Sequence, residues 1–152
     1  MVGNTRAVLP AFLFCGALVA MFGLASAGRT RTVTNDANKN NIARGKYLVE
    51  EVAKCPECHT PRDAKGNLDG HAWLQGAPIW IMPVRPIPNW ADRAPALAGL
   101  PSFTDVQMER VLEKGSGPEG ETLRPPMHTY HMAPEDAKAI IAYLKSLPIE
   151  KH

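Results

Sequence analysis

The sequence contains two cysteines and a histidine in the consecutive pattern Cys55-Pro56-Glu57-Cys58-His59. A C-x-x-C-H pattern is typical of covalent haem attachment, because two thiols at this spacing form thioether bonds with the vinyl groups of the porphyrin. The imidazole that follows reaches the iron from one side. The pattern occurs once. We therefore expect one haem c, attached to Cys55 and Cys58 and ligated by His59.

A zinc hook and a redox-active dithiol are the alternatives for a C-x-x-C pair. The remaining cysteine, Cys15, lies in an uncharged N-terminal stretch, so both thiols of the expected folded domain belong to the pattern. Neither alternative needs a histidine directly after the second cysteine. His128 and His131 would complete a zinc set, but they lie much further along the chain than in a compact zinc finger. These features favour the haem.

The N-terminal residues have the composition of a secretory signal. Arg6 precedes an uncharged, mostly apolar stretch, residues 7–27, which ends in Ala25-Ser26-Ala27. A basic residue, an apolar segment and an A-x-A site are typical of a cleaved signal peptide. The same 21 uncharged residues are also long enough for an uncleaved membrane anchor. We expect residues 1–27 to direct export to the periplasm, by either route.

The remainder of the chain has the size of one ordinary domain. Residues 28–41 are polar apart from one valine, which predicts a flexible lead, and residues 42–150 are expected to form the folded domain. The whole chain carries 17 basic and 15 acidic residues, a formal net charge of +2. This balance does not favour nucleic-acid binding, so partners would be recognised by uneven placement of charge.

A first helix is expected over residues 41–54. Asn41 is a suitable N-cap, and apolar residues follow at helical spacing. Gly45 marks a place where a second helix could approach closely. This helix would run directly into the cysteine motif.

Two further helices are expected towards the C-terminus. Thr104 and Gln107 form a capping-box pattern, which predicts a helix that ends at Gly115. Pro134 suits the first position of the last helix, whose apolar residues recur every three or four positions until Pro148 stops it. No alternating strand pattern competes, so the predicted fold class is all-α.

A proline-rich segment, residues 61–101, separates the motif from the second helix. It holds seven of the 14 prolines and all three tryptophans, which favours a long wrapped loop over a helix. Trp73, Trp80 and Trp90 could cover the edges of a haem and donate an indole N–H to a propionate, or they could fill a small core. The sequence leaves both roles open for each tryptophan.

The second iron ligand distinguishes a carrier from an enzyme. Met127 follows Pro125 and Pro126, which stiffen the backbone and could present the thioether from a loop at a fixed angle. Met127 is therefore the expected ligand. The other downstream candidates are the methionines and histidines at Met82, Met108, Met132, His71, His128 and His131.

Several segments resemble the class I cytochromes c. They are residues 43–49 (ARGKYLV), 58–62 (CHTPR), 117–120 (GPEG), 124–136 (RPPMHTYHMAPED) and 142–148 (AYLKSLP). The resemblance extends over residues 42–148 and is strongest to cytochrome domains and subunits that accompany bacterial periplasmic dehydrogenases. It implies a small all-α cytochrome c fold, with the N- and C-terminal helices packed around the haem and the proline-rich loop as an insertion.

The resemblance also implies roles for individual residues. The methionine after the prolines is the distal ligand of the family, which corresponds to Met127. The segment PALAG, residues 95–99, matches a family pattern in which the Pro95 carbonyl accepts the imidazole N–H of His59 and Leu97 packs on the haem. Relatives commonly have a proline after the distal methionine, whereas this chain has His128.

These ligands predict a function. Histidine and methionine ligation raises the reduction potential and fills both axial positions, so no substrate reaches the iron. We expect a monohaem carrier of single electrons and not an enzyme. The carrier would exchange electrons with a dehydrogenase, an oxidase or another cytochrome. The alternatives are a permanently bound subunit of such a complex and, less favoured, a haem enzyme or sensor with an open distal site.

Overall fold

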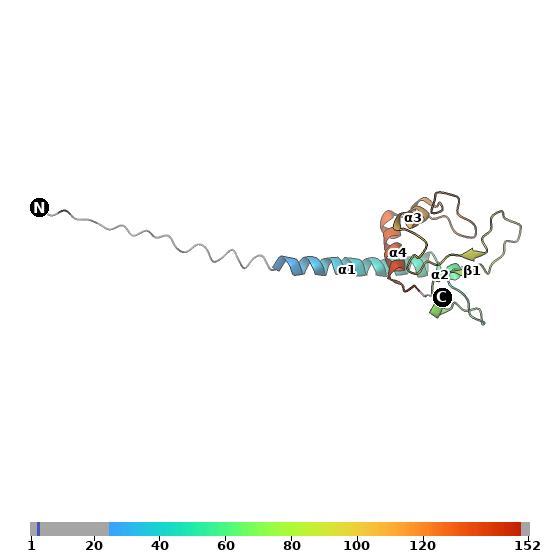
Figure 1. Cartoon of the computed structure of the whole chain (residues 1–152), viewed down its shortest axis with the longest axis horizontal. Coiled ribbons are helices and arrows are strands. Elements are labelled where there is room, and N and C mark those ends of the chain that lie inside the picture. Colours follow the sequence, from blue (N-terminus) through green and yellow to red (C-terminus); the bar gives the residue numbers. More distant parts are fainter. Residues whose placement is uncertain (1–2, 4–24, 150–152) are drawn as a thin grey trace. The chain divides into compact units, whose positions relative to one another are not determined.

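The computed structural model describes residue 3 and residues 25–149, which are coloured in Figure 1. Most of the predicted signal peptide, residues 1–27, lies outside the described residues. The chain divides into two units, Met1–Asn35 and Asp36–His152, and the packing described below lies within the second. Among the described residues, no helix combines the length and apolar composition that a membrane span requires.

The first helix begins much earlier than the sequence predicts. Helix α1 spans Ala25–Tyr47 and therefore runs through residues 28–41, which were expected to form a flexible lead. No glycine or proline follows Gly28 until Gly45, so nothing in the backbone stops the helix from extending upstream. Residues 35–41 of this stretch all face solvent, which explains their polar composition.

A short π-helix, η1, continues α1 over Leu48–Val52 and leads into the cysteine motif. Its Leu48 and Val49 are buried in the core. The helical stretch thus ends at Val52, close to the predicted end at residue 54.

The C-terminal helix α4, Pro134–Ser146, crosses the end of α1 at Gly45. A Cβ atom at Gly45 would overlap the backbone carbonyl of Ala139 and lie 2.8 Å from the Cβ of Tyr143. Any larger residue would force the two helices apart. The close approach predicted at Gly45 is therefore confirmed.

The helix between them is also where the sequence predicts it. Helix α3 spans Asp105–Glu109 and continues as the π-helix η3, Arg110–Lys114. The capping box is formed in both directions, since Gln107 N donates to Thr104 Oγ1 at 3.3 Å and Thr104 N donates to Gln107 Oε1 at 2.9 Å. Gly115 closes the helix with a φ of 66°, a left-handed conformation that favours glycine.

The helices enclose a single apolar core. Its members come from η1, α3, η3, α4 and residues 74–100, and Trp73, Phe103, Tyr130, Met132 and Leu147 pack against its edge. The buried residues of this core are Leu48, Val49, Leu74, Leu97, Ala98, Leu100, Met108, Leu112, Ala137, Ala139, Ile140, Ile141, Tyr143 and Leu144.

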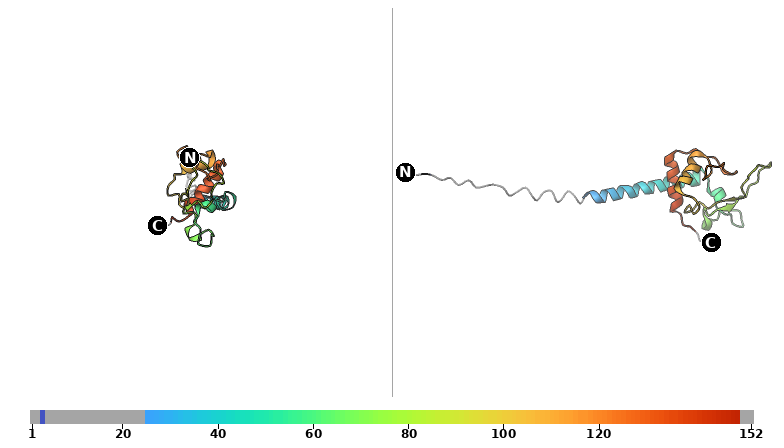
Figure 2. Two further views of the ribbon diagram at one scale, coloured as in Figure 1. Left: turned by 90° about the vertical axis from the view of Figure 1, so that its right-hand side faces the viewer. Right: turned by 45° about the horizontal axis from the view of Figure 1, so that its top comes forward.

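Residues 61–101 contain only short elements. They are the 3₁₀ helix η2, Gly70–Ala72, and two strands of two residues each, β1 at Ala77–Pro78 and β2 at Arg93–Ala94. The strands pair antiparallel, with Ala77 opposite Ala94. The segment between them projects from the helices (Figures 1 and 2).

Candidate functional site

The cysteine motif forms helix α2, Pro56–His59, with Cys55 at its N-cap. Pro56 suits the first helical position, and the His59 amide donates to the Cys55 carbonyl at 3.0 Å. Cys55 and Cys58 are both free thiols and partly exposed. Burial raises the pKa of Cys55 to about 11 and also raises the pKa of Cys58. Both side chains are therefore uncharged thiols at neutral pH.

His59 is held in one orientation by a backbone carbonyl. The residue is only 5% exposed, and Nδ1 lies 2.8 Å from the Pro95 carbonyl oxygen. A carbonyl only accepts, so Nδ1 carries the proton and Nε2 keeps its lone pair. Burial lowers the pKa of His59 and outweighs the opposite effect of the Pro95 hydrogen bond. The result is a neutral imidazole with one nitrogen available to a metal.

The Pro95 carbonyl is itself fixed by neighbouring hydrogen bonds. The amides of Leu97 and Ala98 both donate to the Leu74 carbonyl, at 2.8 and 3.1 Å, and the Gly76 amide donates to the His59 carbonyl at 2.8 Å. Leu97 is 6% exposed and belongs to the core. Residues 74–76 and 95–98 therefore form a frame around the imidazole.

Two residues of this frame were not identified from the sequence. Thr60 is buried, and its Oγ1 accepts a hydrogen bond from the Leu74 amide at 3.0 Å. Gly76 has a φ of 82°, and a Cβ there would lie 2.8 Å from the Ala96 nitrogen. In the sequence, Gly76 is one of several glycines in loop segments, and nothing local distinguishes it from the others.

Met127 lies in a loop that is bonded to the proline-rich segment. Met127 is partly buried, and its amide donates to the Arg124 carbonyl at 3.2 Å. The Arg124 guanidinium donates to the carbonyls of Asn89 and Trp90 at 3.2 and 3.1 Å, and the Ala91 amide donates to the carbonyl of residue 125 at 2.7 Å. These contacts hold the loop that carries Met127 against residues 89–91.

The other candidate ligands occupy different environments. Met108 is 5% exposed within the core, whereas Met82 is 82% exposed. Met132 packs against the core, and its amide donates to the Leu112 carbonyl at 2.9 Å. The candidate histidines at His71, His128 and His131 are all exposed.

Tyr130 connects the Met127 loop to the cysteine motif. Its hydroxyl donates to the Ala53 carbonyl at 3.2 Å. Burial and the neighbouring Cys55 and Cys58 raise the pKa of Tyr130 to about 12. The loop of the predicted distal ligand and the motif of the predicted proximal ligand are therefore brought together, although more than 70 residues separate Tyr130 from Ala53.

Two buried donors near this region fit a haem. Within the described residues, Arg62 Nε and Trp90 Nε1 are the buried side-chain atoms that lack a hydrogen-bond partner. Both atoms only donate, so each requires an acceptor. The two propionates of a haem would supply carboxylate oxygens to such donors. The residues present thus suit the cofactor that the motif predicts.

The three tryptophans have three different environments. Trp73 packs against the edge of the core, as the core-filling role predicts. Trp80 is 58% exposed, and its Nε1 donates to the Glu57 carbonyl at 3.0 Å. Trp90 is partly buried with its indole N–H unpartnered among the described residues.

The zinc alternative has no support in the geometry. Within residues 25–149, no three His, Cys, Asp or Glu side chains lie close enough together to share a metal ion. The set of Cys55, Cys58, His128 and His131 therefore does not assemble.

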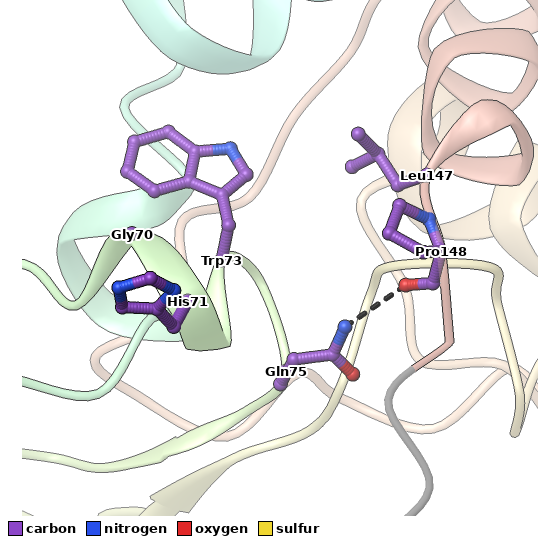
Figure 3. Close-up of a pocket in the computed structure, with 6 residues that line it drawn as sticks. All are labelled: Gly70, His71, Trp73, Gln75, Leu147 and Pro148. Carbon is purple, nitrogen blue, oxygen red and sulfur yellow. Dashed lines mark hydrogen bonds between the residues drawn. The ribbon is translucent and has the colours of Figure 1, made fainter.

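A separate hollow of about 240 Å³ lies between η2 and the end of α4 (Figure 3). Trp73 and His71 stand on one side and Leu147 on the other, and Gln75 Nε2 donates to the Pro148 carbonyl at 2.9 Å. None of Cys55, Cys58, His59 and Met127 lines it. The hollow is therefore not part of the motif-centred site.

The chain is similar in sequence to known proteins. The cytochrome c family model matches residues 42–148. The fructose dehydrogenase cytochrome subunit of Gluconobacter japonicus is 35% identical over 124 residues, which covers 76% of this chain and 24% of the relative. A diheme cytochrome c-type protein of Cereibacter sphaeroides is 32% identical, covering 69% of this chain and 35% of the relative.

The cytochrome c subunit of the quinone-dependent alcohol dehydrogenase of Gluconobacter oxydans is 31% identical. The match covers 78% of this chain and 26% of that relative. The chain thus spans about a quarter to a third of the length of the curated relatives it matches.

Proposed function

The chain belongs to the cytochrome c family, and from this premise we propose that it is a periplasmic carrier of single electrons with one haem c. When bound, the haem supplies an iron that alternates between the ferric and ferrous states. Cys55 and Cys58 would hold the porphyrin covalently, and His59 and Met127 would ligate the iron. The hydrogen bond from His59 Nδ1 to the Pro95 carbonyl is the observation that carries this proposal, because it leaves Nε2 free to ligate.

The surrounding residues suit electron transfer without catalysis. The burial of His59 and Leu97 would disfavour the more highly charged ferric state of a bound haem and would so raise its reduction potential. Met127 would fill the remaining axial position and keep substrates from the iron. Arg62 and Trp90 would donate their unpartnered N–H groups to the propionates.

A permanently bound dehydrogenase subunit is a second form of the same function. Two relatives are named as cytochrome subunits of a fructose dehydrogenase and an alcohol dehydrogenase, which favours a dehydrogenase as the electron donor. A bound subunit should co-purify with its enzyme, whereas a free carrier should elute alone at its monomer mass.

The test is expression of the full chain in a host that matures c-type cytochromes. We expect a Soret band and haem that resists acid–acetone extraction. Cys58→Ala should lower the haem content, whereas Cys15→Ala should not change it. An exported but colourless protein would contradict the proposal.

A further inference from the structure

An exposed apolar segment, here called the apolar loop (residues 79–88), projects from the domain between β1 and β2 (Figures 1 and 2). It holds four large apolar side chains with high exposed fractions: Trp80 at 58%, Met82 at 82%, Val84 at 102% and Ile87 at 44%. Neighbouring apolar side chains left in solvent usually mark an interaction surface.

We propose that the apolar loop is the docking surface for a one-electron redox protein, and that Trp80 couples the docked partner to the cysteine motif. The proposal rests on the proposed function and adds to it the surface that the partner occupies and the chemistry of that partner. Tryptophan is enriched among the residues that dominate binding energy at interfaces.

Trp80 is connected to the motif through a hydrogen bond. Its Nε1 donates to the Glu57 carbonyl at 3.0 Å, and the carbon of that carbonyl is bonded directly to the nitrogen of Cys58. One hydrogen bond and a few covalent bonds thus join an exposed indole to a predicted haem thioether. Electron tunnelling falls off less steeply through such a bonded path than through space, so this path would couple a partner docked at Trp80 to the motif.

Arg62 fixes the indole in this position. Its Cζ lies 4.4 Å from the centre of the Trp80 ring, while its guanidinium donates to Glu57 Oε2 at 2.7 Å and to the Gly66 carbonyl at 2.8 Å. A cation over the ring stabilises the neutral indole and disfavours removal of an electron from it. Trp80 is therefore suited to mediate electron tunnelling between the partner and the motif, and not to be oxidised to a radical itself.

Charge around the apolar loop indicates the kind of partner. Arg85 is the one charged residue in the sequence from 79 to 91. At the base of the loop Asp92, whose Oδ1 lies 3.8 Å from the Arg124 guanidinium, is followed by Arg93 in β2, so arginines outnumber carboxylates there. In the part of the chain that the structure describes, neither Arg85 nor Arg93 forms an ion pair with an acidic side chain. The complementary partner has an apolar face bordered by acidic side chains. Three prolines within the loop limit its freedom before docking, which lowers the entropy lost on binding.

The electron balance is simple. One electron leaves the reduced partner and reduces the ferric haem to the ferrous state, and no atom or proton is transferred. The partner leaves oxidised by one electron.

The first test measures docking with the full, haem-loaded chain. The probe is a blue copper protein that has an acidic patch beside an apolar face, titrated in its oxidised form against the ferric chain so that no electron is transferred, and calorimetric titration gives the Kd. Val84→Asp should raise the Kd about tenfold, because it places a negative charge in the apolar contact. The matched control is Val106→Asp, which alters a valine that is 64% exposed on α3, and it should leave the Kd unchanged.

The second test separates binding from coupling. Trp80→Phe keeps a ring over Arg62 but removes the N–H group, so the Kd should stay close to the wild-type value. The rate constant of electron transfer within the complex should fall several-fold. Reduction by hexaammineruthenium(II), which does not need to dock, should proceed at the wild-type rate.

Several outcomes would overturn the inference. Equal Kd values for Val84→Asp and Val106→Asp would exclude the apolar loop as the docking surface, and an unchanged rate for Trp80→Phe would exclude the coupling role. The loop would be assigned to a lipid surface instead if the wild type sediments with phosphatidylglycerol vesicles, Val84→Asp does not, and the Kd for the copper protein is the same for both.

A chain that carries no haem would overturn this inference together with the proposed function. A haem-loaded chain in which Val84→Asp and Trp80→Phe have no effect would overturn the docking surface alone.

Discussion

The Tyr130 hydroxyl donates a hydrogen bond to the Ala53 carbonyl at 3.2 Å, so the loop that carries Met127 is fastened to the residues that lead into the cysteine motif. A single partly buried hydrogen bond of this kind contributes about 1 kcal/mol to stability. Here it also joins the two segments that would ligate one iron atom from opposite sides.

Loss of that hydrogen bond should loosen the distal loop before it unfolds the domain. In haem-loaded Tyr130→Phe, we expect the absorption band of the iron–sulfur bond to disappear at a lower denaturant concentration than in the wild type. The free energy of global unfolding should fall by only about 1 kcal/mol. Coincident loss of the band and of helical circular dichroism, at the wild-type midpoint, would contradict the role of Tyr130.

The distal ligand can be tested directly. Met127→Ala should leave the haem attached, remove the iron–sulfur band and lower the reduction potential, because a thioether favours ferrous iron. Met82→Ala and Met132→Ala are the controls and should keep both the band and the potential. Retention of the band in Met127→Ala would move the assignment to another methionine, and carbon monoxide binding to the wild type would favour an open site.

The unpartnered indole of Trp90 gives a prediction with a definite sign. Because Trp90 Nε1 would donate to a propionate, Trp90→Phe should destabilise the haem-loaded protein by about 1–3 kcal/mol. A neutral or stabilising effect would contradict this role, because it is the result expected when a buried polar group without a bond is removed. Denaturant titration of the two proteins decides between these signs.

Gly76 and Gly66 form a matched pair. Both have positive φ values, 82° and 86°, so Gly→Ala should cost about 1–2 kcal/mol of backbone strain at either site. A Cβ at Gly76 would also crowd the Ala96 nitrogen at 2.8 Å, whereas nothing lies within 4 Å at Gly66. Gly76→Ala should therefore reduce the free energy of unfolding more than Gly66→Ala. It should also displace Pro95 from His59 and change the reduction potential, which Gly66→Ala should not.

Tyr143 predicts a dependence of stability on pH. Its hydroxyl donates to Glu50 Oε1 at 2.5 Å, and burial followed by the contact with Glu50 raises the pKa of Tyr143. A raised pKa means that this stabilisation is complete below the pKa of an unfolded tyrosine, about 10, and is lost as the pH rises through the higher pKa of the folded state.

We therefore expect the free energy of unfolding of the wild type to fall more steeply above about pH 10 than that of Tyr143→Phe. Tyr47→Phe, which alters a tyrosine that is 54% exposed, should retain the steep wild-type dependence. Parallel curves for the wild type and Tyr143→Phe would show that the hydroxyl contributes nothing that titrates.

Sequence patterns between neighbouring residues predicted structure well. The capping box of Thr104 and Gln107 and the start of α4 at Pro134 were confirmed, because the groups that form these signals lie within one helical turn. The predicted start of the first helix, at residue 41, was wrong, because α1 begins at Ala25. Polar composition indicates exposure, and an exposed segment can still be helical.

By itself, the sequence determined the cysteine motif and the family, because the two thiols and the imidazole are contiguous and their spacing is intrinsic to the chain. The tertiary structure decided which distant groups meet that motif. Whether Trp73, Trp80 or Trp90 is packed, exposed or left with a free N–H depends on residues far away in sequence, as does the approach of Tyr130 to Ala53. Such relationships arise only when the folded chain buries its apolar surface, and no local pattern records them.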